Sequence, residues 1–314
     1  MDARQLRYRL EYVVFCAILF FVRCLPVRSS IRVANTLAWF LHDVLPRKWT
    51  RYAVSSENIR TAFGGDVLEE RVDQMTREMW QHLVRIVFEM IQMDRRLRLY
   101  NCTDVIEFRN RNPCVNAITS GRPVLLLGGH FGNWEVSVNT FGDFGFPMGV
   151  VARDLDNPWL HGWFKDVRES KGNWMISKAG ASSDLVGIME NGECASLLGD
   201  QDAGKRGVFV DFFGKPASTF KSIALLALQH DAIICVGGTY RLPEDPESRW
   251  VQYNMTTEDV IDSRDFQTAN AVPELTQRFT TAIENLVRRA PEQYFWVHRR
   301  WKTPPRKARK SKAA

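Results

Sequence analysis

The stretch GGHFGNWE (residues 128–135) holds a histidine and a carboxylate five positions apart, directly after the apolar run PVLLL (123–127). On one regular helix, five steps of about 100° would put His130 and Glu135 on different faces. We therefore expect His130 in a turn at the end of a strand, with Asn133 as the N-cap of a helix that begins after it. The three glycines would let the backbone turn tightly and come close to a ligand.

From the first turn of that helix, Glu135 could fold back to the imidazole of His130. A carboxylate on one ring nitrogen fixes the tautomer, so that the other nitrogen can take a proton from a hydroxyl. The alternative is a purely structural histidine–glutamate pair. The HExxH pattern is absent and no second histidine is near, which argues against a zinc site. We predict no metal and no cofactor.

Several common motifs are missing from the chain. It has no GxSxG elbow, which would supply a serine nucleophile. It has neither GxxxxGK[ST] nor GxGxxG, which removes the usual nucleotide-binding loops. A histidine base without a protein nucleophile indicates direct transfer, in which a hydroxyl of the substrate attacks an activated acyl group.

The elements that must position these residues alternate in type from about residue 103. Helix-like stretches such as 184–191 and 221–230 separate short β-like runs. The β-like runs cover 123–128, 148–153, 194–200, 207–213 and 232–240. This alternation predicts an α/β fold with a largely parallel sheet. In such sheets, binding sites gather at the carboxyl ends of the strands.

Further polar residues follow two of these runs. Asp200, Gln201 and Asp202 could contact the substrate or support the histidine–glutamate pair, although helix N-capping needs the same residue types. Arg153 ends another run, and its guanidinium suits a phosphate; a surface salt bridge is the alternative. The run FWVHRRWK (295–302) is predicted as an interfacial aromatic and basic cluster, or as a last strand with a solvated edge.

The N-terminus gives a membrane signal. The run YVVFCAILFFV (12–22) has no charge and is flanked by arginines, but about 20 apolar residues are needed to cross a bilayer. We interpret residues 1–26 as an uncleaved membrane anchor, either a marginal span or a helix in the interface. Residues 27–102 are predicted to be helical, with a long amphipathic helix whose apolar residues recur every three or four positions from Val72 to Met90.

Positive charge is concentrated at the two ends of the chain. Residues 1–60 hold ten Lys/Arg against four Asp/Glu, and residues 302–314 hold six Lys/Arg and no acidic residue. The ends would therefore face a polyanion such as a phospholipid surface, although the tail could be merely solvated. The acidic balance of the middle argues against nucleic-acid binding. Six cysteines without CxxC spacing indicate a reducing compartment.

The segment HFGNWE (130–135) matches the HxxxxD/E motif of glycerolipid-type acyltransferases, and the whole chain resembles the bacterial lipid A late acyltransferases, the lauroyl/myristoyl transferases. Further blocks in family order support the resemblance: ENIRTAFGG (57–65), VVARDLDNPWL (150–160), GECASLLGDQD (192–202), GVFVDFFGKPAST (207–219) and APEQYFWVHRRWKTPP (290–305). Together they cover nearly the whole chain.

The resemblance implies a membrane anchor, an acyltransferase-like α/β core over 103–305 and a basic tail over 306–314. It implies a bacterial enzyme at the cytoplasmic face of the inner membrane, which transfers a fatty acyl chain from an acyl-carrier-protein thioester. The acceptor would be an anionic glycolipid, namely a hydroxyl on a hydroxyacyl chain of a lipid A precursor. The alternatives are another acceptor, such as a phosphatidylinositol mannoside or an amino-acid lipid, and a non-enzymatic membrane scaffold.

The resemblance also assigns roles to the candidate residues. His130 would be the general base and Glu135 the carboxylate that orients it. The expected substrate-binding residues are Gly129, Asn133, Arg153, Asp200, Gln201 and Asp202.

Overall fold

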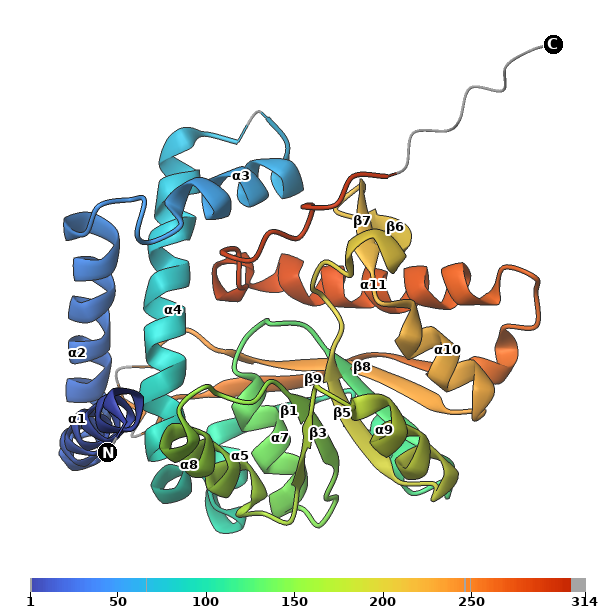
Figure 1. The fold of residues 1–314 in the computed structure, drawn as a ribbon, viewed down its shortest axis with the longest axis horizontal. Helices are drawn as coiled ribbons and strands as arrows, with labels where there is room; N and C mark the ends of the chain where they lie inside the picture. Colours follow the sequence, from blue (N-terminus) through green and yellow to red (C-terminus); the bar gives the residue numbers. More distant parts are fainter. Residues whose placement is uncertain (1, 66, 246, 249, 306–314) are drawn as a thin grey trace.

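The computed structural model describes residues 2–65, 67–245, 247–248 and 250–305 (Figure 1). The basic tail expected over 306–314 lies outside the described residues. The main sheet has seven strands in the order β1-β9-β8-β2-β5-β3-β4. These strands are β1 (Ile106–Arg109), β2 (Val124–Gly128), β3 (Gly149–Ala152), β4 (Trp174–Ser177), β5 (Cys194–Leu198), β8 (Ile233–Arg241) and β9 (Tyr253–Asp262).

The pairing in this sheet is parallel everywhere except between β8 and β9. The prediction of an α/β fold with a largely parallel sheet is therefore confirmed. Four of the five predicted β-like runs form β2, β3, β5 and β8. The fifth, 207–213, forms β6 (Val208–Phe212), but it pairs with β7 (Lys215–Thr219) in a separate hairpin.

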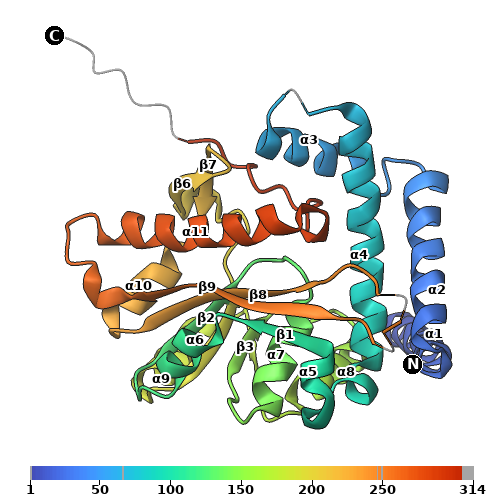
Figure 2. The ribbon, with the colours of Figure 1, turned by 180° about the vertical axis from the view of Figure 1, so that it is seen from behind.

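Helices cover both faces of the sheet. The chain forms α5 (Cys102–Val105), α6 (Arg111–Ile118), α7 (Trp134–Asp143), α8 (Pro158–Glu169), α9 (Ala181–Glu190), α10 (Lys221–Gln229) and α11 (Ala271–Arg289). In Figures 1 and 2, α10 and α11 lie on one side of the sheet, and α7 and α8 lie on the other. The predicted helices at 184–191 and 221–230 correspond to α9 and α10.

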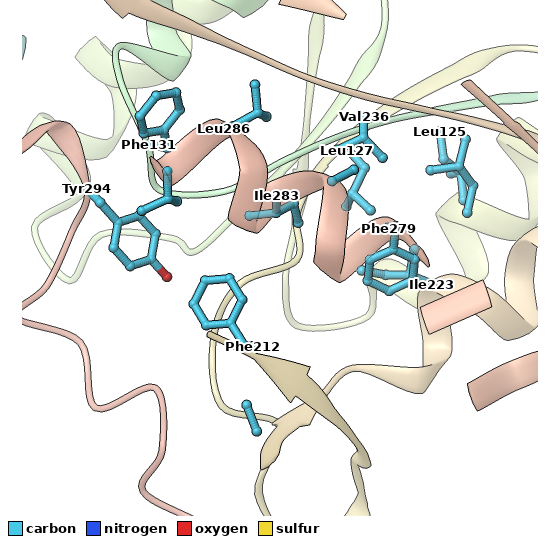
Figure 3. Packing of buried hydrophobic residues seen from close by; sticks show 14 of the residues in the cluster. Leu125, Leu127, Phe131, Phe212, Ile223, Val236, Phe279, Ile283, Leu286 and Tyr294 are labelled. Carbon is cyan, nitrogen blue, oxygen red and sulfur yellow. The ribbon is translucent and has the colours of Figure 1, made fainter. Parts of the chain in front are cut away.

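The main core lies between the sheet and α11. Alternate residues of a strand point to opposite faces, so Leu125 and Leu127 of β2 face the same way. Both are fully buried in one cluster with Phe279 and Ile283 of α11. Figure 3 shows these side chains together with Val236 of β8, which lies beside β2. This packing fixes the carboxyl end of β2, from which the candidate catalytic turn starts.

The N-terminal region is helical as predicted, with α1 (Ala3–Cys24), α2 (Val27–Trp39), a π-helical turn (Phe40–Val44), α3 (Tyr52–Phe63) and α4 (Glu69–Arg96). In both views α4 lies between α2 and the sheet (Figures 1 and 2). Its residues Val72, Met75 and Met79 are buried in the same cluster as the sheet residues. The division into a helical region that ends at residue 102 and an α/β core that begins at residue 103 stays a prediction.

Helix α1 leaves most of its apolar side chains exposed, and only Tyr8, Leu19 and Val22 are buried. Within the described part of the chain, no helix combines the length and apolarity that a bilayer span requires. The prediction of a spanning anchor at residues 1–26 therefore finds no support.

Candidate active site

The turn after β2 has the geometry expected from its sequence. Asn133 caps α7, because its side chain accepts a hydrogen bond from the N–H of Val136 at 3.2 Å. Gly132 has a φ of +58°, a left-handed conformation that favours glycine. A Cβ at Gly132 would lie 2.1 Å from the carbonyl oxygen of Thr239, so strand β8 leaves no space for a side chain. His130 therefore lies in a rigid turn at a strand end.

The carboxylate that contacts His130 is Asp200. Strands β2 and β5 are neighbours, with Gly128 paired to Leu198, so their carboxyl ends lie side by side. Nδ1 of His130 lies 2.7 Å from Oδ1 of Asp200, and the backbone N–H of His130 donates to Oδ2 at 2.8 Å. With Nδ1–H donated to the carboxylate, Nε2 carries the free lone pair that a base needs.

The two groups shift each other's pKa in opposite directions. Burial acts to lower the pKa of His130, but the charge and hydrogen bond of Asp200 outweigh it, and the pKa is raised. Burial acts to raise the pKa of Asp200, but the charge and hydrogen bonds of His130 hold that pKa down at about 2. Asp200 is thus ionised at neutral pH and favours the protonated imidazole that forms when His130 accepts a proton.

Glu135 has different partners from those expected. It is buried, and its carboxylate accepts hydrogen bonds from Nε of Arg168 at 3.0 Å and from Nη2 of Arg168 at 2.5 Å. The indole N–H of Trp134 donates to the same carboxylate at 3.2 Å. The hydrogen bond that would orient the His130 imidazole therefore comes from Asp200 in this structure, and Glu135 joins α7 to α8.

A second buried network holds the turn from behind. Nε2 of His82, on α4, lies 3.2 Å from the carbonyl oxygen of Gly132. Nη1 of Arg241 lies 3.1 Å from the other ring nitrogen of His82. Arg241 also forms a two-point ion pair with Glu89, at 2.7 and 2.9 Å, and Glu89 accepts from the side chain of Asn133 at 2.8 Å. The pKa of His82 is lowered, by burial first and then by the charge of Arg241.

A C-terminal segment, residues 291–303, closes over the turn. The N–H of Gly132 donates to the carbonyl of Gln293 at 2.9 Å, and the N–H of Phe295 donates to the carbonyl of His130 at 3.0 Å. Arg300 is buried and anchors the segment to β7 through the carbonyl of Ser218, at 2.6 Å. Trp296 is also buried and no strand forms here, so both predictions for 295–302 are wrong.

A large cavity of about 1020 Å³ opens beside His130. Gly129, His130 and Gln201 line it together with many apolar side chains, among them Phe141 and Leu197. Strand β3 leads into α8 on one face of the sheet, whereas β5 leads through the hairpin to α10 on the other. Such a divergence of connections opens a crevice at the carboxyl edge of a sheet, as the sequence led us to expect.

The remaining predicted residues have different surroundings. Gln201 reaches the His130–Asp200 pair, with its amide nitrogen 3.3 Å from Nε2 of His130. Arg153 lines the cavity and has an 80% exposed side chain with a loose 3.7 Å contact to Asp156. Asn133 is fully buried and holds the turn.

Asp202 has a holding role in the loop after β5. Its carboxylate accepts a hydrogen bond from the hydroxyl of Thr303 at 2.9 Å and another from the N–H of Gly204 at 3.1 Å. Both contacts are within the protein, so Asp202 ties the C-terminal segment to this loop.

Four residues of these hydrogen-bond networks were not predicted from the sequence, namely His82, Glu89, Arg168 and Arg241. They lie on three separate elements, α4, α8 and β8, and belong to no local motif. The one available signal was the polar content of the long helix, where His82 and Glu89 are seven positions apart and share a face.

Comparison with known proteins agrees with the resemblance drawn from the motifs. The family model described as bacterial lipid A biosynthesis acyltransferase matches residues 2–303. A lipid A biosynthesis palmitoleoyltransferase of Escherichia coli (strain K12) is 24% identical over 261 residues, which cover 81% of this chain and 80% of that protein.

Two further relatives have similar names. A lipid A biosynthesis lauroyltransferase of the same organism is 30% identical over 192 residues, which cover 59% of this chain and 58% of that protein. A lipid A biosynthesis acyltransferase of Haemophilus influenzae is 22% identical over 290 residues, which cover 91% of this chain and 84% of that protein. The chain is thus an acyltransferase and belongs to the bacterial lipid A biosynthesis acyltransferase family.

Proposed function

We propose that the protein transfers a fatty acyl chain from an acyl-carrier-protein thioester to a hydroxyl on a hydroxyacyl chain of a lipid A precursor. The observation that carries this proposal is the His130–Asp200 pair at the wall of an apolar cavity of about 1020 Å³. A base beside a hydrocarbon-sized cavity suits a reaction between a hydroxyl and a long-chain acyl donor. The lipid A acceptor is proposed from the names of the relatives, a lipid A biosynthesis palmitoleoyltransferase and a lipid A biosynthesis lauroyltransferase.

In the proposed mechanism, Nε2 of His130 takes the proton of the acceptor hydroxyl. The hydroxyl oxygen attacks the thioester carbonyl carbon, the carbon–sulfur bond of the resulting adduct breaks, and His130 returns the proton to the thiolate. Asp200 keeps Nδ1–H in place and stabilises the imidazolium between the two steps. The amide of Gln201, now 3.3 Å from Nε2, must give way to the incoming hydroxyl.

The oxyanion of the adduct needs hydrogen-bond donors that are not already used. The backbone N–H groups of His130, Gly132 and Asn133 donate within the protein, to Asp200, Gln293 and Thr239. We assign this role to the side-chain amide of Gln201, because it lines the cavity within reach of the reacting atoms. Gln201→Ala should then lower kcat by about 10²–10³-fold with little change in KM.

The other predicted site residues receive supporting roles. Arg153 and Lys178 line the cavity and provide positive charge for an anionic headgroup or carrier. Gly129 leaves room for the carboxylate of Asp200 in the cavity wall, since a Cβ at this position would lie 3.3 Å from that carboxylate. Glu135, through its ion pair with Arg168, positions two cavity walls, α7 and α8.

We further propose that the protein works on the cytoplasmic face of the bacterial inner membrane, with α1 lying in the interface. Its exposed apolar side chains are Leu6, Leu10, Val13, Val14, Ile18, Phe20 and Phe21, and arginines flank them. A helix with such side chains and flanking cations binds anionic membranes without crossing them. Vesicle flotation checks this: Leu10→Glu together with Val13→Glu should release the protein from anionic vesicles. Unchanged flotation would remove the role of α1.

Acyl transfer with the purified protein tests the reaction, the donor and the acceptor together. Radiolabelled acyl-carrier-protein donors are offered with a lipid A precursor, and in parallel with a phosphatidylinositol mannoside. We expect labelled lipid A and an inactive His130→Ala variant. His230→Ala, a histidine at the end of α10 outside the cavity lining, is the matched control and should keep full activity. Label in the mannoside alone, or full activity of His130→Ala, would contradict the proposal.

A further inference from the structure

Strands β3 and β5 separate at their carboxyl ends. They pair only at Gly149–Ala195 and Val150–Ser196. Beyond that point β5 continues to pair with β2 as far as Leu198, and β3 continues to pair with β4 as far as Ala152. The sheet therefore forks in its interior, one strand away from the end of β2 where His130 lies.

The cavity beside His130 is lined from both faces of this forked sheet. Leu126 and Val150 line it, and both belong to the cluster on the α7 face. Leu127 and Leu197 line it as well, and they pack in the cluster on the α10 face. Because neighbouring residues of a strand point to opposite faces, one continuous cavity can meet both sets only by passing the edge of a strand.

The accessibility of β5 supports this passage. A strand in the middle of a covered parallel sheet is normally buried on both faces. Ser196, at the last pairing with β3, and Leu197 and Leu198, beyond it, are instead only half-buried, on alternating faces. Their side chains border open space on both sides of the sheet.

The cavity thus has two apolar arms. We call the first the α7 arm, lined by Phe108, Cys114, Val115, Val138, Phe141, Met148 and Met175. We call the second the α10 arm, lined by Ala181, Leu185, Leu197, Phe220, Ile223 and Leu226. In Figure 1, α7 and α10 lie on opposite sides of the sheet.

We infer that the two arms hold two different hydrocarbon chains, the acyl chain of the donor in one and the hydroxyacyl chain of the acceptor in the other. This inference rests on the proposed function, in which both reactants are long-chain acyl compounds. The thioester carbonyl is at the end of one chain and the hydroxyl is on the other, so the two chains must converge at His130. A fork one strand from His130 lets them approach from opposite faces of the sheet without occupying the same space.

The size of the cavity agrees with this assignment. Pockets for single drug-sized ligands span about 300–1,000 Å³. At about 1020 Å³, the cavity lies just above that range, although each reactant places only a narrow chain in it. A single chain would leave much of the apolar lining in contact with water, which costs about 25 cal/mol of free energy per Å² of exposed apolar surface.

Tryptophan substitutions that fill one arm each test the inference. Val115→Trp on α6 narrows the α7 arm, and Ala181→Trp on α9 narrows the α10 arm. Both residues are half-buried, so neither substitution replaces a fully buried side chain. The matched controls are Asn116→Trp and Ser183→Trp, exposed neighbours on the same helices outside the cavity lining.

The first measurement varies the chain length of the donor and that of the acceptor hydroxyacyl group separately. We expect one variant to lose about tenfold or more in kcat/KM with the longest donors only, and the other variant to lose as much with the longest acceptors only. The control variants should keep both profiles. The inference would be overturned if both variants changed the same chain-length profile, donor or acceptor. It would also be overturned if neither variant changed a profile.

The second measurement does not depend on acyl transfer. Native mass spectrometry with dodecanoic acid counts the chains bound per protein. We expect two in the wild type, one in each single variant and none in the double variant. A single bound chain in the wild type, or loss of both chains in one single variant, would overturn the inference. If two chains bind but no lipid A is acylated, the proposed function fails, and with it the donor and acceptor identities of the chains, while the binding of one hydrocarbon chain in each arm stands.

Discussion

Two histidines contact the same turn, the half-buried His130 and the buried His82, and their partners shift their pKa values in opposite directions. His130 faces the cavity and its Nδ1 lies 2.7 Å from a carboxylate oxygen of Asp200. His82 lies behind the turn, and its Nδ1 is 3.1 Å from a guanidinium nitrogen of Arg241. The pKa of His130 is raised, whereas the pKa of His82 is lowered by burial and by the positive charge of Arg241.

This difference shows how the partner, more than the burial, decides what an imidazole can do. Beside a carboxylate, His130 can accept a proton, because the imidazolium is stabilised. Beside a guanidinium, His82 stays neutral: its Nδ1 accepts a hydrogen bond from Arg241, and its one N–H, on Nε2, donates to the carbonyl of Gly132. One histidine is suited to chemistry and the other to holding the turn on which the chemistry depends.

The largest effect should come from removing the base itself. His130→Ala should lower acyl transfer by about 10²–10⁴-fold, since the proposed mechanism gives the hydroxyl proton to His130. On a scale of 1.36 kcal/mol per tenfold, the upper end is about 5 kcal/mol of transition-state stabilisation. Initial rates with a saturating donor measure this loss. Retention of more than a tenth of the activity would mean that His130 is not the base.

The second-largest effect should be on stability and should arise on the His82 side. Glu89→Gln leaves Arg241 buried without its carboxylate, and breaking such a pair costs about 3–5 kcal/mol. The free energy of unfolding, measured with a chemical denaturant, should fall by that amount. Glu57→Gln, an exposed glutamate on α3, serves as the control. A loss below about 1 kcal/mol for Glu89→Gln would show that the network does not hold the turn.

Asp200→Asn should have an intermediate effect, because it makes the surroundings of His130 more like those of His82. Misplacing the base should cost about 10²-fold in kcat. The base must be unprotonated, so activity rises with pH through the pKa of His130. Without the carboxylate the imidazolium loses its stabilisation, that pKa falls, and the acidic limb of the pH–rate profile moves to lower pH. A limb that stays in place would contradict the role of Asp200.

The smallest effect should follow from replacing the neutral histidine. His82→Gln removes the hydrogen bond to Gly132 and one contact of Arg241, which should lower the free energy of unfolding by about 1–3 kcal/mol. Activity should fall less than for Asp200→Asn. The pH–rate profile should keep its position, since a neutral His82 does not titrate in the working range. A shifted profile would mean that His82 exchanges protons during the reaction.

The sequence predicted the local part of this site well. The glycine-rich turn, the cap by Asn133 and the position of His130 at a strand end depend on neighbouring residues, and the structure confirms them. The pairing of His130 with Asp200 joins residues seventy positions apart and depends on β5 lying next to β2. Sequence order does not give that adjacency, because β3 and β4 intervene along the chain, and Glu135 was the nearer carboxylate.

The strands that escaped prediction have physical reasons of their own. Strands β1 and β4 are four residues long, too short for an alternating pattern to stand out. Strand β9 is ten residues long but includes Glu258 and Asp259, whose charges pair with Arg289 and Arg278 of α11. Such charged residues interrupt the apolar pattern of a strand, so a prediction based on hydrophobicity misses it. The fork between β3 and β5 is likewise a property of pairing that no local pattern records.

The C-terminal segment has a consequence for when the enzyme can first work. Residues 291–303 contribute the carbonyl of Gln293 and the N–H of Phe295 to the turn that carries His130, and Thr303 forms a hydrogen bond with Asp202. A ribosome makes these residues after every strand of the sheet, so a nascent chain can complete its sheet while the turn is still open on one side. His130 is thus held by residues that are made after the whole sheet, and a chain that stops before residue 291 has the cavity lining without this support of the turn.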